Sequence, residues 1–271
     1  MKVKTFREIE YQAWSERASQ YDLLIGSVSK QVSENILDNL GSLQGKHHLD
    51  LACGTGHMVA KATKRGLISE GIDFSPAMVN AARTNYPGER FQVADATDLP
   101  YEDAAFDLVT CSFGLTHMEN PPAAADQIFR VLKPGGCFAF TLWYGPEKGN
   151  EQRAMIKTAL EKHATTDFML PSEWTHLRNA NKGACEELTS SAGFGNPVFE
   201  ILPLVWQARS AQEVIDHSLK LSVRNKLMVE RQPVATQQRI YEQILREAQK
   251  RQTNGVIPLA CPALLTIVQK P

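Results

Sequence analysis

Short apolar runs alternate with amphipathic stretches along this chain. The apolar runs have the length of β-strands, and most of the stretches between them repeat their apolar positions with the period of an α-helix. The expected strands are 48–51, 67–73, 90–94, 106–112, 137–144, 198–206 and 264–268. Strands that alternate with helices predict a doubly wound α/β sheet, and the almost wholly apolar run 106–112 suits a central strand covered on both faces.

Helical patterns flank this alternation and occupy much of the second half. They are expected at 5–24, 28–40, 150–163, 181–192 and 210–252, the last with an internal break at 231–233. No repeat or low-complexity segment occurs, so we expect one domain over 1–271. Its parts are an N-terminal helical lid (1–45), a cofactor-binding core (46–144) and an acceptor-side half (145–271). The last part contains a helical insertion at 207–255.

The turn after the first expected strand has the composition of a ligand cradle. Asp50 ends the strand, and Gly54 and Gly56 lie in the turn before a helix. Glycines allow a ligand to approach the unpaired N–H groups at a helix start. A dinucleotide loop would require a glycine where Val59 stands. Asp50 would also repel a pyrophosphate, whereas it would suit a cation.

Residues 50–56 closely resemble the first motif of class I S-adenosyl-L-methionine (SAM) dependent methyltransferases, D/E-x-G-x-G-x-G, with Ala52 in place of the first glycine. SAM carries the sulfonium and amino groups that an acid would attract. The turn R-V-L-K-P-G-G at 130–136 is characteristic of the same family, and the resemblance is continuous from 46 to 144. It is strongest to the ubiquinone and menaquinone C-methyltransferases and natural-product methyltransferases. It implies a seven-stranded sheet of order 3-2-1-4-5-7-6, with strand 7 antiparallel and helices on both faces.

Acids end the first three expected strands, at the carboxyl edge where open parallel sheets bind ligands. Asp73 follows Gly56 by 17 residues, about the spacing at which an acid takes the ribose hydroxyls. The resemblance assigns Asp95 and Ala96 to the adenine, although Asp95 alone would also suit an Asx turn. The predicted cofactor-binding residues are Tyr21, Asp50, Ala52, Gly54, Gly56, Asp73, Phe74, Met78, Asp95, Ala96 and Ser112.

Aromatic residues and one histidine are the candidates for the acceptor side. Tyr11 and Trp14 belong to a pattern similar to the N-terminal lid of many small-molecule methyltransferases, although an ordinary amphipathic helix explains it equally well. Trp143 and Tyr144, leaving the fifth strand, suit either a floor under a planar acceptor or core packing.

Methyl transfer to a hydroxyl or an activated carbon also needs a base. His117, just past the fourth strand, is the predicted catalytic residue and acceptor contact. The alternative is that it caps the loop at Asn120 or fills a gap.

Composition limits the partners. The chain has 271 residues and a formal net charge of −1, so no basic field favours nucleic acid. Its five cysteines are scattered singly, which suggests neither a disulfide framework nor a metal site and fits a reducing, cytoplasmic compartment. The chain has no signal-peptide pattern and no apolar run long enough to span a membrane. We expect a monomer or homodimer.

The predicted function is therefore methyl transfer from SAM to a small-molecule acceptor, with S-adenosyl-L-homocysteine (SAH) as the product. C- or O-methylation of an aromatic or quinone-like metabolite is expected. The motifs describe the cofactor and not the acceptor, so two alternatives stay open: a SAM-binding protein without transferase activity, and a SAM-using enzyme of another reaction type. An NAD-dependent dehydrogenase is disfavoured by Val59.

Overall fold

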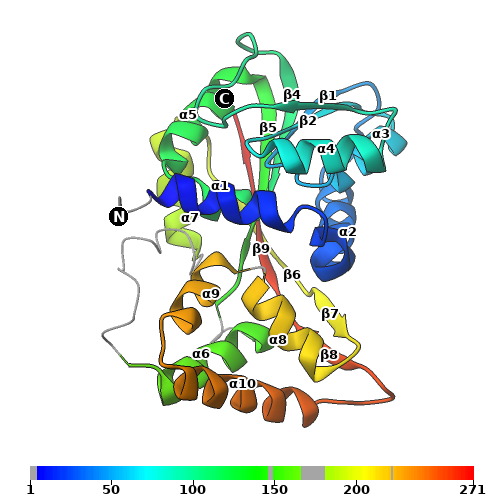
Figure 1. Ribbon diagram of the computed structural model, residues 1–271. Helices are drawn as coiled ribbons and strands as arrows, with labels where there is room; N and C mark the ends of the chain where they lie inside the picture. Colours follow the sequence, from blue (N-terminus) through cyan, green and yellow to red (C-terminus); the bar gives the residue numbers. More distant parts are fainter. Residues whose placement is uncertain (1–4, 146–148, 166–180, 221) are drawn as a thin grey trace. The chain divides into compact units, whose positions relative to one another are not determined.

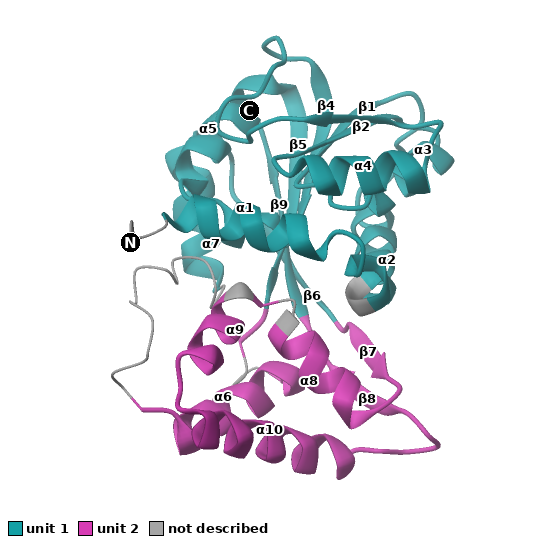
Figure 2. Cartoon of the chain, in the orientation of Figure 1, with its two compact units in different colours: residues 1–143, 180–202, 263–271 teal, residues 144–179, 203–262 magenta. Residues whose placement is uncertain are grey.

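The computed structural model describes residues 5–145, 149–165, 181–220 and 222–271. The chain forms two compact units (Figures 1 and 2). The first consists of residues 1–143, 180–202 and 263–271, and the second of residues 144–179 and 203–262. Each unit is described by itself.

A seven-stranded sheet of order β3-β2-β1-β4-β5-β9-β6 forms the centre of the first unit. Its strands are β1 (His47–Leu51), β2 (Ile68–Asp73), β3 (Arg90–Val93), β4 (Phe106–Ser112), β5 (Leu132–Trp143), β6 (Val198–Leu202) and β9 (Ala263–Gln269). The first five pair in parallel, whereas β9 runs antiparallel to both β5 and β6. The predicted fold class and strand order are confirmed, with β9 as the seventh strand of the prediction.

Helices cover both faces of this sheet (Figure 1). They are α1 (Phe6–Arg17), α2 (Tyr21–Asp38), α3 (His57–Lys64), α4 (Pro76–Asn85), the short 3-10 helix η1 (Gly114–His117), α5 (Pro121–Val131) and α7 (Lys182–Ser191). Local chemistry fixes their starts. Thr5 and Glu8 form a capping box at α1, and Ser75 and Asn120 accept backbone N–H groups at α4 and α5, each followed by a proline.

The sheet core is apolar and tightly enclosed. Leu49, Val109, Phe138 and Phe140 have no exposed surface, as expected for strands buried on both faces. Each such side chain stabilises the fold by roughly 1.5–3 kcal/mol relative to exposure. This rigid core positions the loops that leave β1, β2, β3 and β4 at one edge.

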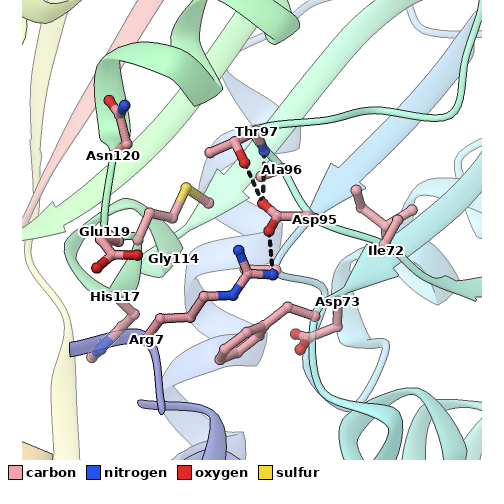
Figure 3. A pocket seen from close by; sticks show the side chains of 14 residues that line it. Arg7, Ile72, Asp73, Asp95, Ala96, Thr97, Gly114, His117, Glu119 and Asn120 are labelled. Atoms are coloured by element: carbon pink, nitrogen blue, oxygen red, sulfur yellow. Dashed lines mark hydrogen bonds and ion pairs between the residues drawn. The ribbon is translucent and has the colours of Figure 1, made fainter. Parts of the chain in front are cut away.

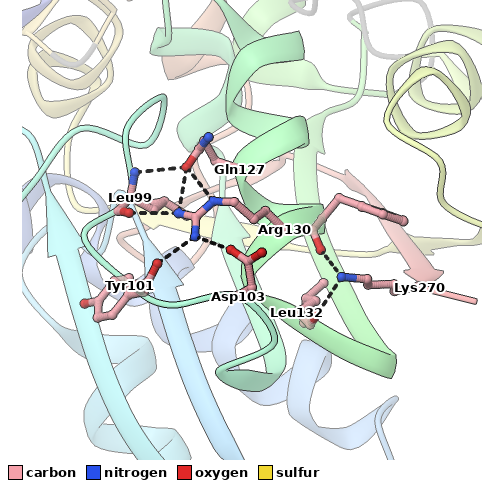
Figure 4. A network of polar contacts seen from close by, with 8 residues as sticks. Leu99, Tyr101, Asp103, Gln127, Arg130, Leu132 and Lys270 are labelled. Carbon is pink, nitrogen blue, oxygen red and sulfur yellow. Dashed lines mark hydrogen bonds and ion pairs between the residues drawn. The ribbon is translucent and has the colours of Figure 1, made fainter.

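The loop after β3 is held by Arg130, the first residue of the R-V-L-K-P-G-G turn (Figure 4). Its guanidinium donates to the carbonyl oxygens of Leu99 and Tyr101 at 2.9 and 2.7 Å and to the Asp103 carboxylate at 2.9 Å. Lys270 secures the other side of the turn by donating to the Leu132 carbonyl oxygen at 2.8 Å. These contacts give the turn a physical role, because the loop that they hold begins at the predicted adenine-binding acid.

The second unit contains four helices and a pair of antiparallel strands among its described residues. They are α6 (Glu151–His163), α8 (Ala211–Lys220), α9 (Val223–Glu230), α10 (Val234–Gln249), β7 (Val205–Ala208) and β8 (Ile257–Ala260). The predicted break at 231–233 is confirmed, since α9 ends at Glu230 and α10 begins at Val234.

The expected strand 198–206 is wrong at its end. β6 stops at Leu202, next to Pro203, which has no N–H to donate to a sheet. Residues 205–208 instead form β7 and pair with β8, so an antiparallel pair of strands flanks the insertion expected at 207–255.

Candidate active site

The turn between β1 and α3 adopts a strained, tightly fitted conformation. Ala52, Gly54 and Gly56 have φ angles of 51°, 52° and 90°. Glycine adopts such angles without steric cost, whereas Ala52 does so with a Cβ. That Cβ has space because Gly114 of η1 lies opposite: a Cβ built on Gly114 would be 2.5 Å from it. A Cβ on Gly56 would come 2.6 Å from the ring of Phe91.

Asp73, at the end of β2, ties this turn to the start of α4. Its Oδ2 accepts from the Gly54 N–H at 3.0 Å, and its Oδ1 accepts from the Ser75 N–H at 2.9 Å. Each carboxylate oxygen keeps a second lone pair for another donor. Burial raises the pKa of Asp73 to about 6, against the effect of these two hydrogen bonds.

Asp50, at the end of β1, is also buried. Its Oδ1 accepts the hydroxyl of Thr110 at 2.6 Å. Burial raises its pKa to about 7, and the charge of Asp73 raises it further. Across the described residues, neither acid forms a salt bridge. Two buried acids that raise each other's energy when charged are stabilised by a nearby positive charge, so they favour a cationic ligand.

Ser112, at the end of β4, has a buried hydroxyl that a ligand could pair with. Its Oγ is buried and has no hydrogen-bond partner among the described residues. Buried polar atoms are normally paired, so an orphan beside a candidate site needs an explanation. A polar ligand group at this edge would supply one.

A pocket opens at the same edge of the first unit (Figure 3). It is lined by residues from the loops after β1, β2, β3 and β4 and by one residue of α1: Arg7, Ala52, Ile72, Asp73, Phe74, Ala94, Asp95, Ala96, Thr97, Gly114, His117, Met118, Glu119 and Asn120. The predicted residues Ala52, Asp73, Phe74, Asp95 and Ala96 are among them, as is His117. The residues predicted to meet the ribose and adenine thus line one pocket.

Asp95 forms the Asx-type turn considered for it and also lines the pocket. Its Oδ1 accepts the N–H and the hydroxyl of Thr97 at 2.9 and 2.7 Å, which is an Asx-type turn. Its Oδ2 forms an ion pair with Arg7 at 2.6 Å (Figure 3). Burial would raise the pKa of Asp95, but the hydrogen bonds from Thr97 and the charge of Arg7 outweigh burial and lower it. The sequence pattern did not single out Arg7.

One face of α1 lies against the cofactor loops. Tyr11 contacts Phe74 edge to face, with ring centroids 5.9 Å apart. Trp14 contacts Tyr21 in the same way at 6.1 Å. The ring of Tyr21 lies beside the glycine turn, since a Cβ built on Gly54 would be 3.8 Å from it. The residues predicted for the lid and those predicted for the cofactor therefore interlock within the first unit.

Asp22, in the first turn of α2, anchors the lid to the glycine turn. It accepts the Thr55 hydroxyl at 2.6 Å and the Asn85 amide at 2.9 Å, and it pairs with His57 Nε2 at 2.9 Å. Burial would raise its pKa, but these hydrogen bonds outweigh burial and lower it. Asp22 was not among the predicted site residues. The acid directly after Tyr21 was the sequence feature that could have indicated it.

His117 lies at the end of η1 and faces the lid. Its Nδ1 is 3.0 Å from Oε2 of Glu10, and its ring contacts Trp14 edge to face at 4.9 Å. The alternative was that His117 caps the loop at Asn120. In the structure Asn120 caps α5 itself, by accepting the Ala123 N–H at 3.1 Å. His117 is therefore held by α1.

The remaining predicted residues do not line the pocket. Met78 is 2% exposed within α4. Trp143 stacks on Phe113 with ring centroids 3.8 Å apart, and Tyr144 is buried in the second unit. The pocket lining also lacks five further predicted residues, Tyr21, Asp50, Gly54, Gly56 and Ser112. Their predicted roles in binding remain predictions.

In the part of the chain that the structure describes, no group of three or more His, Cys, Asp or Glu side chains is placed to hold a metal ion. No helix of the described residues is both long and apolar enough to cross a bilayer.

Comparison with known proteins shows what the core of this fold resembles. Residues 49–140 match the family model described as "Methyltransferase domain". Over these residues the chain is similar to methyltransferase domains. The predicted resemblance to class I SAM-dependent methyltransferases is confirmed for this core, and with it SAM as the cofactor of the domain.

Individual relatives agree with the family. The demethylmenaquinone methyltransferase of Clavibacter sepedonicus is 44% identical over 95 residues, which cover 34% of this chain and 39% of that protein. The chain spans less than half of the length of the first curated relatives it matches. The sequence similarity to these relatives covers between 34% and 42% of this chain.

Solved structures extend the likeness in fold. Phosphoethanolamine N-methyltransferase 2 of Haemonchus contortus, solved with phosphomonomethylethanolamine and SAH, has a TM-score of 0.61 at 18% identity and covers 99% of this chain and 61% of that chain. The [4+2]-cyclase SpnF also has a TM-score of 0.61 at 18% identity, and covers 100% of this chain and 98% of that chain. At these identities the fold is shared, and the reaction does not follow from it.

Proposed function

We propose that this protein is a SAM-dependent methyltransferase that acts on a small-molecule acceptor and releases SAH. The observation that carries the proposal is the pair of buried, coupled acids Asp50 and Asp73 around a glycine turn, without a cationic side chain of their own in the described chain. The amino and sulfonium groups of SAM supply the missing positive charge. The residues that match the methyltransferase family model include the same turn.

The binding roles follow from position. Asp50 receives the amino group, and the second lone pairs of Asp73 receive the ribose hydroxyls. Asp95 and the backbone of Ala96 meet the adenine in the pocket that they line, beside Phe74. The buried Ser112 hydroxyl donates to a polar group at the methionine end.

Methyl transfer from SAM requires that the protein position the acceptor and supply one base. Bound SAM supplies a methyl group on a positively charged sulfur, which leaves as a neutral thioether. The chain must hold the acceptor in line and exclude water, and α1 and the aromatic residues around Trp14 suit this task. His117 takes the proton that a hydroxyl or an acidic carbon loses as it forms its new bond to the methyl group.

An aromatic or quinone-like acceptor is the acceptor class that we favour. The support is the relative from Clavibacter sepedonicus, whose name specifies demethylmenaquinone, together with the candidate base His117, whose ring contacts Trp14. C- and O-methylation both satisfy this arrangement, since either acceptor gives up a proton to a base.

The likeness to the [4+2]-cyclase SpnF favours a second candidate, a protein of this fold that carries out a reaction other than methyl transfer. One experiment separates the two. The protein is incubated with methyl-labelled SAM and a metabolite extract, and labelled products are sought by mass spectrometry. A new labelled metabolite, absent with the Gly54→Val variant, supports methyl transfer. SAH binding without any labelled product contradicts it and supports the second candidate.

A further inference from the structure

A buried glutamate on α1 lies behind the proposed base. Glu10 is 1% exposed, although it belongs to a helix outside the sheet. Its Oε2 lies 3.0 Å from Nδ1 of His117 and also accepts the indole N–H of Trp14 at 3.0 Å. A carboxylate placed in so dry an environment is costly unless its partners compensate for the lost water. The motif resemblance assigned no role to this residue.

The contact decides which nitrogen of His117 reacts. A carboxylate oxygen accepts, so Nδ1 must carry the hydrogen, and Nε2 is left with a free lone pair in the neutral ring. Across the described residues Nε2 has no hydrogen-bond partner, and His117 lines the pocket (Figure 3). The edge-to-face contact with Trp14 restrains the plane of the same ring.

We propose that Glu10 is a positioning residue for methyl transfer: it holds His117 as the Nδ1–H tautomer, aims Nε2 at the acceptor and stabilises the charged ring formed in the reaction. This inference rests on the proposed function. The acceptor O–H or C–H bond gives its proton to Nε2 as the acceptor–methyl bond forms and the sulfur–methyl bond breaks. The positive charge lost from sulfur is then on the imidazolium, whose Nδ1 is next to the Glu10 carboxylate.

The position of Glu10 on α1 couples the base to the cofactor loops. On the same helix, Arg7 pairs with Asp95 and Tyr11 packs on Phe74. The three residues lie on one helical face, at spacings of three and four. Helix α1 therefore contacts the residues proposed to bind adenine, and the same helix supplies the carboxylate that holds His117.

The first test reads the tautomer directly and needs no acceptor. The SAH-bound protein is labelled with ¹⁵N-histidine, and the His117 signals are assigned from their loss in His117→Gln. We expect the Nδ1–H tautomer in the wild type and in Glu10→Gln, whose amide oxygen still accepts. Glu10→Ala should shift the ring toward Nε2–H. Glu16→Gln, the same change of charge on the exposed face of α1, should leave the tautomer unchanged. A wild-type ring in the Nε2–H form overturns the proposal without any variant.

The second test separates positioning from packing by kinetics, with the acceptor found by isotope labelling. Glu10→Ala should lower kcat by about 10²-fold, within the range of general-base effects, while KM for SAM changes less than about twofold. Glu10→Gln should recover part of that kcat, and Glu16→Gln all of it. Equal kcat in all three variants overturns the proposal, as does a loss confined to KM for SAM. If no labelled product is found, the function fails, while the tautomer result still stands on its own.

Discussion

The buried acids make SAH affinity depend on pH, and Asp50 should dominate that dependence. Burial raises the pKa of Asp50 to about 7 and that of Asp73 to about 6. The amino group of SAH is a cation over this range and binds the ionised form of Asp50. Below about pH 7 binding must first remove a proton from Asp50, which weakens the affinity about tenfold for each pH unit. SAH affinity should therefore rise about fivefold from pH 6 to pH 7 and about tenfold from pH 6 to pH 8, where it levels off.

The Asp50→Asn variant should move affinity and stability in opposite directions. An amide keeps the shape and the Thr110 contact but loses the charge-assisted bond, roughly 1.5–3 kcal/mol, or about 10- to 100-fold in SAH affinity at pH 8. An acid whose pKa is raised on folding destabilises the fold progressively as pH rises from about 4 to about 7. Removing its charge should therefore raise the melting temperature of the unliganded protein at pH 8.

Calorimetric titration with SAH at pH 6, 7 and 8 measures both the affinity and the protons released, if two buffers of different ionisation enthalpy are used. The expected result is proton release at pH 6 and pH 7 that Asp50→Asn abolishes. The assignment of Asp50 is refuted if wild-type affinity is constant from pH 6 to pH 8, or if the variant keeps the wild-type slope.

Two further predictions concern the glycine turn and the ion pair at the adenine end. Gly114→Ala should destabilise the protein by about 1–3 kcal/mol, because its Cβ would lie 2.5 Å from that of Ala52. Adding Ala52→Gly to this variant should restore part of the lost free energy of unfolding. If denaturant unfolding shows that the effects of the two substitutions simply add, the contact is not the cause. Arg7→Ala should change SAH affinity less than about fivefold, because the half-exposed ion pair between Arg7 and Asp95 contributes little. Asp95→Ala should weaken SAH affinity about tenfold. If the two variants lose the same affinity, Asp95 acts through Arg7 alone.

The sequence predicted the acids at the edge of the sheet because their positions depend on local patterns. A strand followed by a turn and a helix fixes where Asp50, Asp73 and Asp95 lie, since parallel strands end at the same edge. The alternation of apolar and helical runs predicted the α/β class, whereas the strand order came from the family resemblance. Strand order is a matter of pairing between distant segments, such as β5 and β9, which no local pattern specifies.

The missing features are long-range contacts without a local signature. Arg7, Glu10 and Asp22 are polar residues on amphipathic helices, a pattern that also describes ordinary solvated positions. Their partners are 33 to 107 residues away in the chain, as the Asp22–Thr55 and Glu10–His117 contacts show. The β7–β8 pair was missed for the same reason, because each strand has only four residues and their pairing depends on the helices between them.

The most direct test of the account is whether the carboxyl edge of the first unit binds SAH through Asp73. Calorimetry of SAH with the wild type and Asp73→Ala, with NAD as the competing ligand, gives the answer in one series. The account predicts a saturable SAH isotherm, no heat from NAD, and an affinity at least about tenfold weaker in the variant, because charge-assisted hydrogen bonds to the ribose are lost. Unchanged SAH affinity in Asp73→Ala, or NAD binding tighter than SAH, would contradict it.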